Sequence, residues 1–180
     1  MLLSLGIHHS MTMPILAYVC VTFVKNPKYY FVFWLLCLIM SMFHVTVFQH
    51  LFANYTNEKA TAYLQSFGED WGGRGGFRLD FILYSSMPVL VGWISTYKLK
   101  IKDEITSVFL SMYLLCNGLW MLCMYVNYNN RIAYLSWFMY PLVLLLPSLH
   151  PEWHKREYLS VANIATLHLL FTLFMVLIYY

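Results

Sequence analysis

The sequence predicts an all-α, polytopic integral membrane protein with about six transmembrane helices, forming a single membrane domain over residues 1–180. Hydrophobic residues make up 61% of the chain and charged residues only 11%, whereas soluble domains carry about 25% charged residues. Because a water-exposed surface needs more charged residues than this, we expect most of the surface of the protein to face lipid. The apolar residues also fall in long runs, and a helix needs roughly 20 of them to cross a bilayer.

Six apolar runs are candidate spanning helices, with short polar connections between most of them. The third and fifth runs are short, and Pro88, Pro141 and Pro147 predict kinks or early helix ends there. The six runs are Leu5–Val24, Tyr30–Phe52, Phe81–Tyr97, Ile105–Val126, Ile132–Ser148 and Leu159–Tyr179.

The distribution of Lys and Arg predicts the orientation of these helices, because cytoplasmic loops are enriched in both residues. The loops that carry Lys25 to Lys28, Lys98 to Lys102 and Lys155 to Arg156 are richer in positive charge than the others. We therefore expect them in the cytoplasm, with both termini and the loop 54–80 outside. The net charge of +3 is small and does not indicate a nucleic-acid partner.

The loop 54–80 concentrates the polar residues of the chain, with seven of the charged residues and five of the eight glycines. Glycines let backbone N–H groups turn toward one anion, and Arg74 and Arg78 add planar donors suited to phosphate. Trp71 beside acids and arginines is typical of sugar sites. No nucleotide P-loop pattern occurs. The alternative is a flexible outer loop whose charges are only solvated.

Two kinds of titratable residue are candidates for catalysis at the outer face. Asp70 or Glu69 is placed to act as a general base, whereas Asp80, at the start of a span, is expected to form a structural ion pair with Arg78 or Arg74. His8 and His9 precede the first helix interior, and only one of them can face the bundle. That histidine binds substrate or carries a proton, or else only caps the helix at the interface.

Other polar residues in the apolar runs are expected to form hydrogen bonds between helices. They are His44, Gln49, His50, Asn117, Asn163 and His168.

No cofactor motif or metal site is predicted. His150, Glu152 and His154 lack the spacing of a zinc-protease helix. The four cysteines have no CxxC spacing and are expected to be buried as small hydrophobic residues. They are Cys20, Cys37, Cys116 and Cys123.

Four segments together resemble the EpsG family of bacterial membrane proteins, which are Wzy-like polymerases of exopolysaccharide and O-antigen repeat units. The resemblance runs from about Gly6 to Pro147 and matches the C-terminal half of such proteins; the chain is therefore expected to be part of a larger polymerase. The segments are GIHHS, GGFRLDFILYSSMPVL, YLLCNGLWML and NRIAYLSWFMYPLVLL.

The resemblance implies glycosyl transfer outside the bacterial cytoplasmic membrane, from a polyprenyl-pyrophosphate-linked chain to another lipid-linked repeat unit. It points to Arg74, Arg78 and Arg131 as pyrophosphate-binding residues, with His8 or His9 near the acceptor. A flippase and a chain-length regulator are the implied partners. The alternatives are a non-enzymatic transporter or translocase subunit for polysaccharide export, and a fragment without activity of its own.

Overall fold

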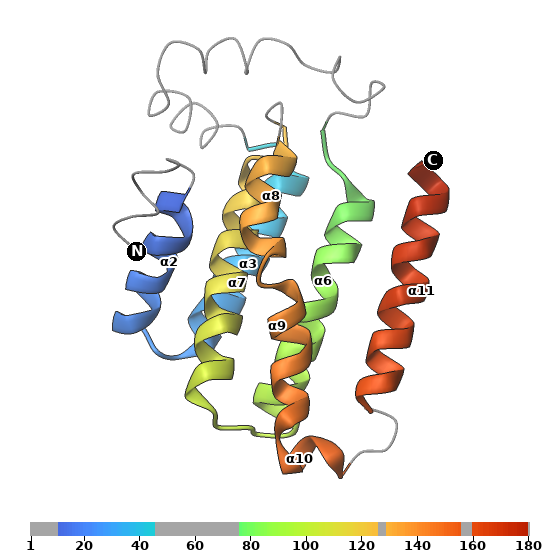
Figure 1. Cartoon of the computed structure of the whole chain (residues 1–180). Coiled ribbons are helices and arrows are strands. Elements are labelled where there is room, and N and C mark those ends of the chain that lie inside the picture. Colours follow the sequence, from blue (N-terminus) through green and yellow to red (C-terminus); the bar gives the residue numbers. More distant parts are fainter. Residues whose placement is uncertain (1–10, 46–75, 126–128, 156–159, 180) are drawn as a thin grey trace.

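The computed structural model describes residues 11–45, 76–125, 129–155 and 160–179 of the chain, and every regular element in these residues is helical (Figure 1). A π-helical turn, η2, extends α6, and a 3₁₀ turn, η3, extends α9. The elements are α2 (Thr12–Phe23), α3 (Pro27–Met42), α6 (Leu79–Trp93), η2 (Ile94–Lys98), α7 (Glu104–Leu122), α8 (Asn129–Trp137), α9 (Tyr140–Leu145), η3 (Leu146–Leu149), α10 (Pro151–His154) and α11 (Val161–Tyr179).

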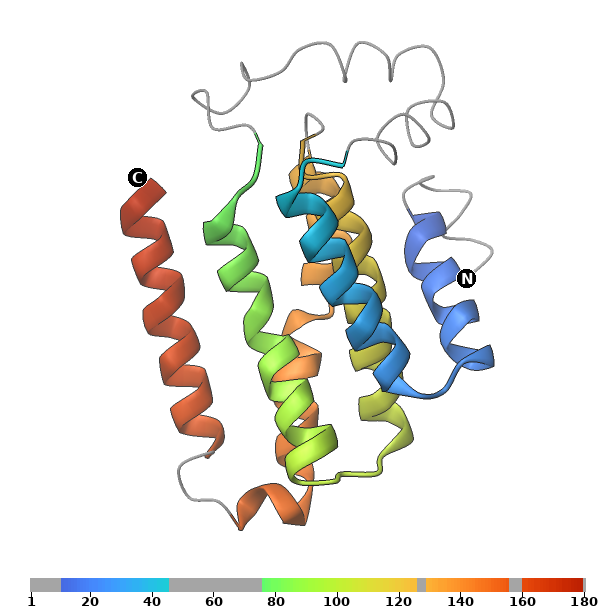
Figure 2. The same ribbon diagram turned by 180° about the vertical axis from the view of Figure 1, so that it is seen from behind.

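Successive helical segments run up and down the bundle, so the connections alternate between its two ends (Figures 1 and 2). The arginine end is where α3 and α7 finish and α6 and α8 begin, and it carries Arg78 and Arg131. The lysine-rich end holds the connections that follow α2, η2 and α10. The lysines at that end are Lys25, Lys28, Lys98, Lys100, Lys102 and Lys155.

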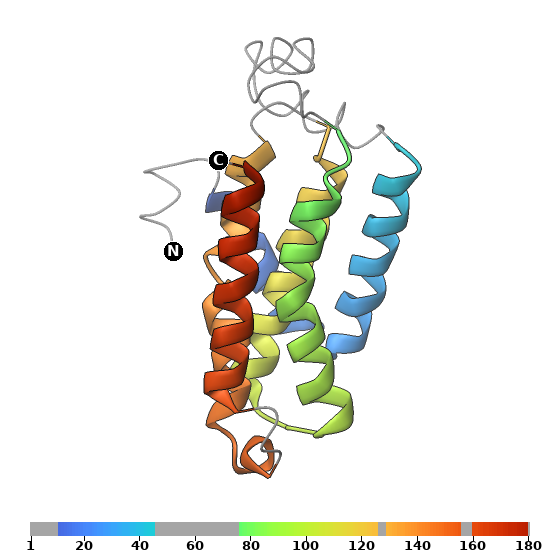
Figure 3. The ribbon, with the colours of Figure 1, turned by 90° about the vertical axis from the view of Figure 1, so that its right-hand side faces the viewer.

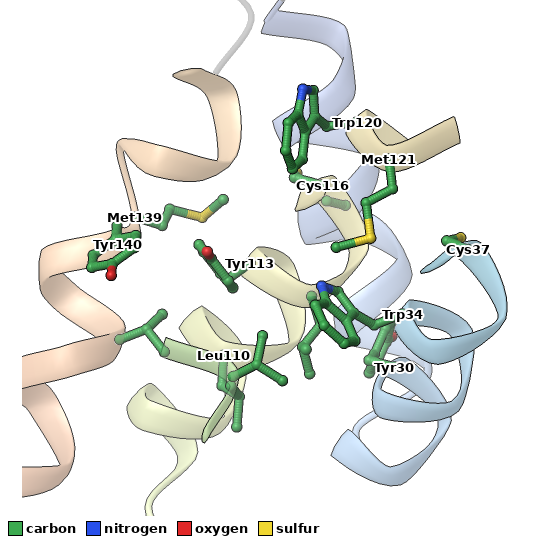
Figure 4. Packing of buried hydrophobic residues seen from close by; sticks show 14 of the residues in the cluster. Tyr30, Trp34, Cys37, Leu110, Tyr113, Cys116, Trp120, Met121, Met139 and Tyr140 are labelled. Carbon is green, nitrogen blue, oxygen red and sulfur yellow. The ribbon is translucent and has the colours of Figure 1, made fainter. Parts of the chain in front are cut away.

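Helix α7 lies at the centre of the bundle and packs against α2, α3, α6, α8 and α9. Its buried residues include Tyr113, Cys116 and Trp120 (Figure 4). Tyr113 packs edge-on against Tyr140 of α9, and Trp120 packs edge-on against Trp137 of α8. A Cβ atom added at Gly118 would lie 2.8 Å from the Phe33 ring on α3. The close approach of α3 and α7 therefore requires glycine at this position, as small residues allow between membrane helices.

Side-chain caps fix the starts of two helices at the lysine-rich end. Asn26 accepts a hydrogen bond from the Lys28 N–H at 3.0 Å, ahead of α3, which has a proline at its start. Asp103 accepts one from the Thr106 N–H at 2.7 Å, ahead of α7. Each cap satisfies a backbone donor that the first helical turn leaves without a partner.

Within the described residues, three helical segments are long and apolar enough to cross a membrane, and three apolar helices are shorter. Each of the six overlaps one predicted run, but six crossings stay a prediction. The long segments are Leu79–Lys98, Glu104–Leu122 and Ile132–Leu149, and the shorter helices are Thr12–Phe23, Pro27–Met42 and Val161–Leu177.

Two predicted helix ends were wrong. Helix α3 stops at Met42 rather than Phe52, and His44 follows in a left-handed conformation with φ 55°. Helix α7 stops at Leu122 rather than Val126. By contrast, the third run spans Leu79 to Lys98, within two residues of its predicted ends, and finishes in the π turn.

The fifth predicted run is not one continuous helix. A turn at Phe138 and Met139 separates α8 from α9, because Pro141 has no N–H to donate to the preceding helical turn. Pro88 lies inside α6 without ending it. Of the four cysteines, Cys20 is exposed, contrary to prediction, and the other three are buried as predicted.

Candidate functional site

The arginine end presents one ion pair at the start of α6. The Arg78 Nε and Nη2 groups donate to the two carboxylate oxygens of Asp80, at 3.2 Å and 3.0 Å. The Arg78 side chain is only 14% exposed and that of Asp80 27%. This geometry confirms the predicted structural pairing of Asp80 with Arg78.

Two further contacts fix Arg78 in place. Its guanidinium carbon lies 4.3 Å from the centre of the Phe81 ring, a cation–π distance. Its backbone N–H donates to the Met124 sulfur at 3.1 Å, which ties the start of α6 to the residues that follow α7. Asp80 also lies in the first turn of α6, where the helix dipole favours a negative charge. The Arg78 guanidinium is thus oriented by Asp80 and Phe81.

A stacked pair of rings lies at the same end. His44 and Tyr125 have ring centres 3.9 Å apart and planes inclined by 26°. The Tyr125 hydroxyl donates to the Ser41 carbonyl oxygen at 3.0 Å, and the Tyr125 ring lies within 4 Å of where a Cβ of Gly76 would be. Sequence reasoning placed His44 inside a spanning helix and missed this pair, because the pairing depends on where α3 and α7 end.

Of the remaining predicted site residues, only Arg131 lies in the described part of the chain. Arg131 lies in the first turn of α8, at the same end as Arg78 (Figure 1), but its side chain is not described. The convergence of three arginines therefore stays a prediction. The other predicted residues lie outside the described part of the chain: His8, His9, Glu69, Asp70, Trp71 and Arg74.

A second polar group lies inside the bundle, between α6, α9 and α11. The Tyr140 hydroxyl donates to the Tyr84 carbonyl oxygen at 3.0 Å and lies 3.3 Å from His168 Nδ1. A hydroxyl has one proton and a carbonyl can only accept, so His168 Nδ1–H is the donor to Tyr140. The Tyr84 and Tyr140 rings stack at 4.8 Å. His168 is confirmed as an interhelical hydrogen-bonding residue, whereas sequence reasoning missed both tyrosines.

Asn117 joins three helices in the core. Its Oδ1 accepts from the Trp34 indole N–H at 2.9 Å, and its Nδ2 donates to the Ser136 hydroxyl at 3.1 Å. All three side chains are buried. The predicted interhelical role of Asn117 is confirmed, and Gln49 and His50 lie outside the described residues.

At the lysine-rich end, Asp103 lies beside α10. The Thr106 side chain and backbone N–H, and more weakly His150, hold the pKa of Asp103 below its usual range. His150 Nε2 lies 3.7 Å from the Asp103 carboxylate, while Glu152 and His154 are exposed. In the part of the chain that is described, no three His, Cys, Asp or Glu side chains are grouped to hold a metal ion.

No family model, curated protein or solved structure matches this chain.

Proposed function

We propose that this chain is part of a bacterial membrane polymerase that joins lipid-linked oligosaccharide repeat units on the outer side of the cytoplasmic membrane. The observation that supports this most is the Arg78–Asp80 pair. It orients a guanidinium group through two hydrogen bonds at one end of the bundle, directly after the glycine-rich segment. The resemblance to EpsG proteins supplies the reaction type.

In the proposed reaction, an acceptor sugar hydroxyl attacks the anomeric carbon of the donor chain. The bond from that carbon to the polyprenyl pyrophosphate breaks, and the pyrophosphate leaves with an added negative charge. Arg78, together with Arg74 and Arg131, stabilises this charge, and a guanidinium already fixed by Asp80 needs no reorganisation as the charge develops. Asp70, Glu69, His8 or His9 accepts the hydroxyl proton.

The test is complementation of a strain that lacks its own polymerase, using the full-length gene. We expect Arg78→Ala to reduce long polymer about 100-fold, the scale reported for lost transition-state donors, while single repeat units remain. Polymer length on a gel and protein level on a blot are the readouts. Lys102→Ala, which removes one exposed charge at the opposite end, is the matched control.

A double variant separates catalysis from stability. If Arg78 only neutralises Asp80, then Arg78→Ala with Asp80→Asn restores polymer, because no unpaired carboxylate remains. If Arg78 binds the pyrophosphate, the double variant stays inactive. Restored polymer would reject the proposed role of Arg78.

The second candidate is a non-enzymatic translocase subunit for polysaccharide export. It is favoured by the break between α8 and α9, beside the Tyr140–His168 contact, because broken helices with polar groups at mid-membrane are typical of transporters. Under this alternative, His168→Phe stops export and Arg78→Ala does not. Under the polymerase proposal, Arg78→Ala stops polymer formation and His168→Phe does not.

A further inference from the structure

The π turn η2 changes which side chains share a face at the end of α6. The Leu99 N–H donates to the Ile94 carbonyl oxygen at 2.9 Å, a hydrogen bond that spans five residues. In an α-helix of 3.6 residues per turn, a residue five positions on points roughly 140° away. A π turn has more residues per turn, so the fifth residue returns to the same face. Lys98 consequently lies over Trp93, with 5.6 Å between its ammonium nitrogen and the ring centre.

The face that carries Lys98 is exposed at the edge of the bundle, where the Tyr97 ring also packs against Phe31 of α3, with ring centres 5.7 Å apart. Trp93 is 44% exposed and Tyr97 40% exposed, their ring centres are 6.3 Å apart, and Lys98 is exposed as well. Figure 3, seen from the side of α11, shows this lower end of the green α6 segment beyond the adjoining end of α3. Tryptophan and tyrosine at the end of a membrane-length helix lie at the depth of the lipid headgroups.

A second lysine, Lys100, follows η2 in a strained backbone conformation. Lys100 has φ 53°, a conformation that glycine adopts without strain and that other residues rarely occupy. Its side chain is exposed. Backbone strain at a residue other than glycine can indicate a functional role. At this strained position the side chain is a cation, which suggests that the positive charge has a use there.

The acids near this turn are engaged elsewhere. Glu104 pairs with Lys25 at 3.3 Å, and Asp103 caps α7 and faces His150. Among the described residues, no ion pair joins Lys98, Lys100 or Lys102 to a carboxylate. The positive charge on this face is therefore complementary to an external anion.

We propose that Trp93, Tyr97, Lys98 and Lys100 bind the headgroup phosphate of an anionic phospholipid. Lys98, held at headgroup depth by the Trp93 ring, is the main phosphate ligand, and Lys100 is the second. The aromatic rings lie against the upper part of the acyl chains. The proposal depends on the chain lying in a membrane but not on polymerase activity, so failure of either proposal leaves the other standing.

The test uses the purified full chain in detergent, titrated with phosphatidylglycerol or with phosphatidylcholine of the same acyl composition. Thermal unfolding is followed at each lipid concentration. We expect phosphatidylglycerol to raise the melting temperature more than phosphatidylcholine does. Lys98→Gln should weaken the apparent affinity for phosphatidylglycerol about fivefold, the scale of one lysine near an anionic surface, and Trp93→Leu should weaken it as well.

The control is Lys102→Gln, which removes the same charge from the same connection without touching Trp93. A loss confined to Lys98→Gln and Trp93→Leu supports a built site. An equal loss in Lys102→Gln means diffuse electrostatic attraction and overturns the proposal. Stabilisation by inorganic phosphate equal to that by phosphatidylglycerol also overturns it, since the site would then be a simple anion site.

Discussion

Helices α7 and α11 are each 19 residues long and strongly apolar, yet they occupy opposite environments. Helix α7 is enclosed by five other helices, whereas α11 lies at the edge of the bundle beside α6 (Figures 1 and 3). The leucines of α11 are mostly exposed. Both helices contain small and polar residues, but those of α7, such as Ser111, Asn117 and Gly118, are buried, whereas Ala165 and Thr166 of α11 are exposed. In lipid, where apolar surface alone does not drive helices together, burial of small and polar residues against neighbouring helices holds α7 at the centre.

Enlarging the smallest residue of α7 should cause the largest loss of stability, because α7 is buried and α11 is not. Gly118→Leu forces a side chain into the Phe33 ring and the Cys37 sulfur, so we expect a loss of about 3 kcal/mol or more in the free energy of unfolding. Ala165→Leu makes a comparable enlargement on an exposed position of α11 and should change stability little. Thermal unfolding in detergent, followed by circular dichroism, measures both. Equal losses would contradict the packing described for α7.

Removing the central amide of α7 should have the next largest effect. Asn117→Leu keeps the side-chain size but leaves the Trp34 indole N–H and the Ser136 hydroxyl without their partner, at a cost of about 1–3 kcal/mol. The matched change in α11 is Thr166→Val at an exposed position. Urea titration of each variant against the wild type gives the difference. A stable Asn117→Leu protein would mean that the hydrogen bonds contribute nothing net.

The attachment of α11 should depend on its one described histidine. His168→Phe keeps an aromatic ring beside Tyr140 but loses the hydrogen bond, for an expected cost of about 0.6 kcal/mol. Limited proteolysis of the connection before α11 reports its detachment. In a double-mutant cycle with Tyr140→Phe, the two losses should not add, because both variants remove the same contact. Additive losses would argue against that contact.

The two helices also differ in the side chains that cap their first turns. Removing these caps should have the smallest effect on stability. The cap of α7 is the Asp103 carboxylate, whereas the Ser160 hydroxyl accepts from the Asn163 N–H at 3.2 Å at the start of α11. Because the folded-state pKa of Asp103 is lowered, its ionised form stabilises the fold above the ordinary pKa near 4. That contribution is lost as the pH falls through the lowered value. The stability difference between wild type and Asp103→Asn should therefore shrink as the pH falls below about 4; Ser160→Ala should show no such trend.

The sequence was sufficient to predict the helical fold of the described residues, the approximate places of the helices and an ion pair of Asp80 with Arg78 or Arg74, of which the structure shows Arg78. The pair was accessible because its residues are two positions apart at the start of one helix. The helix ends were less accessible: the π turn at 94–98 and the break before Pro141 depend on local backbone hydrogen bonding that hydropathy does not report.

Contacts between distant helices were the least predictable. The His44–Tyr125 stack and the Tyr84–Tyr140–His168 group depend on how each helix is rotated about its axis. Hydrophobic periodicity predicts that rotation poorly when nearly every position of a helix is apolar, as in α11. Three buried cysteines and one exposed one illustrate the same limit, since all four lie in runs that look alike.

The hydrogen bond between Trp34 and Asn117 has a consequence for the order of events during synthesis. The two residues are 83 positions apart, and a ribosome adds roughly 5–20 residues per second, so about 4–17 s separate their appearance. During that interval α3 exists without the acceptor that its indole has in the finished protein. The emergence of α7 supplies this acceptor, so the core can form only after α2, α3 and α6 have been synthesised.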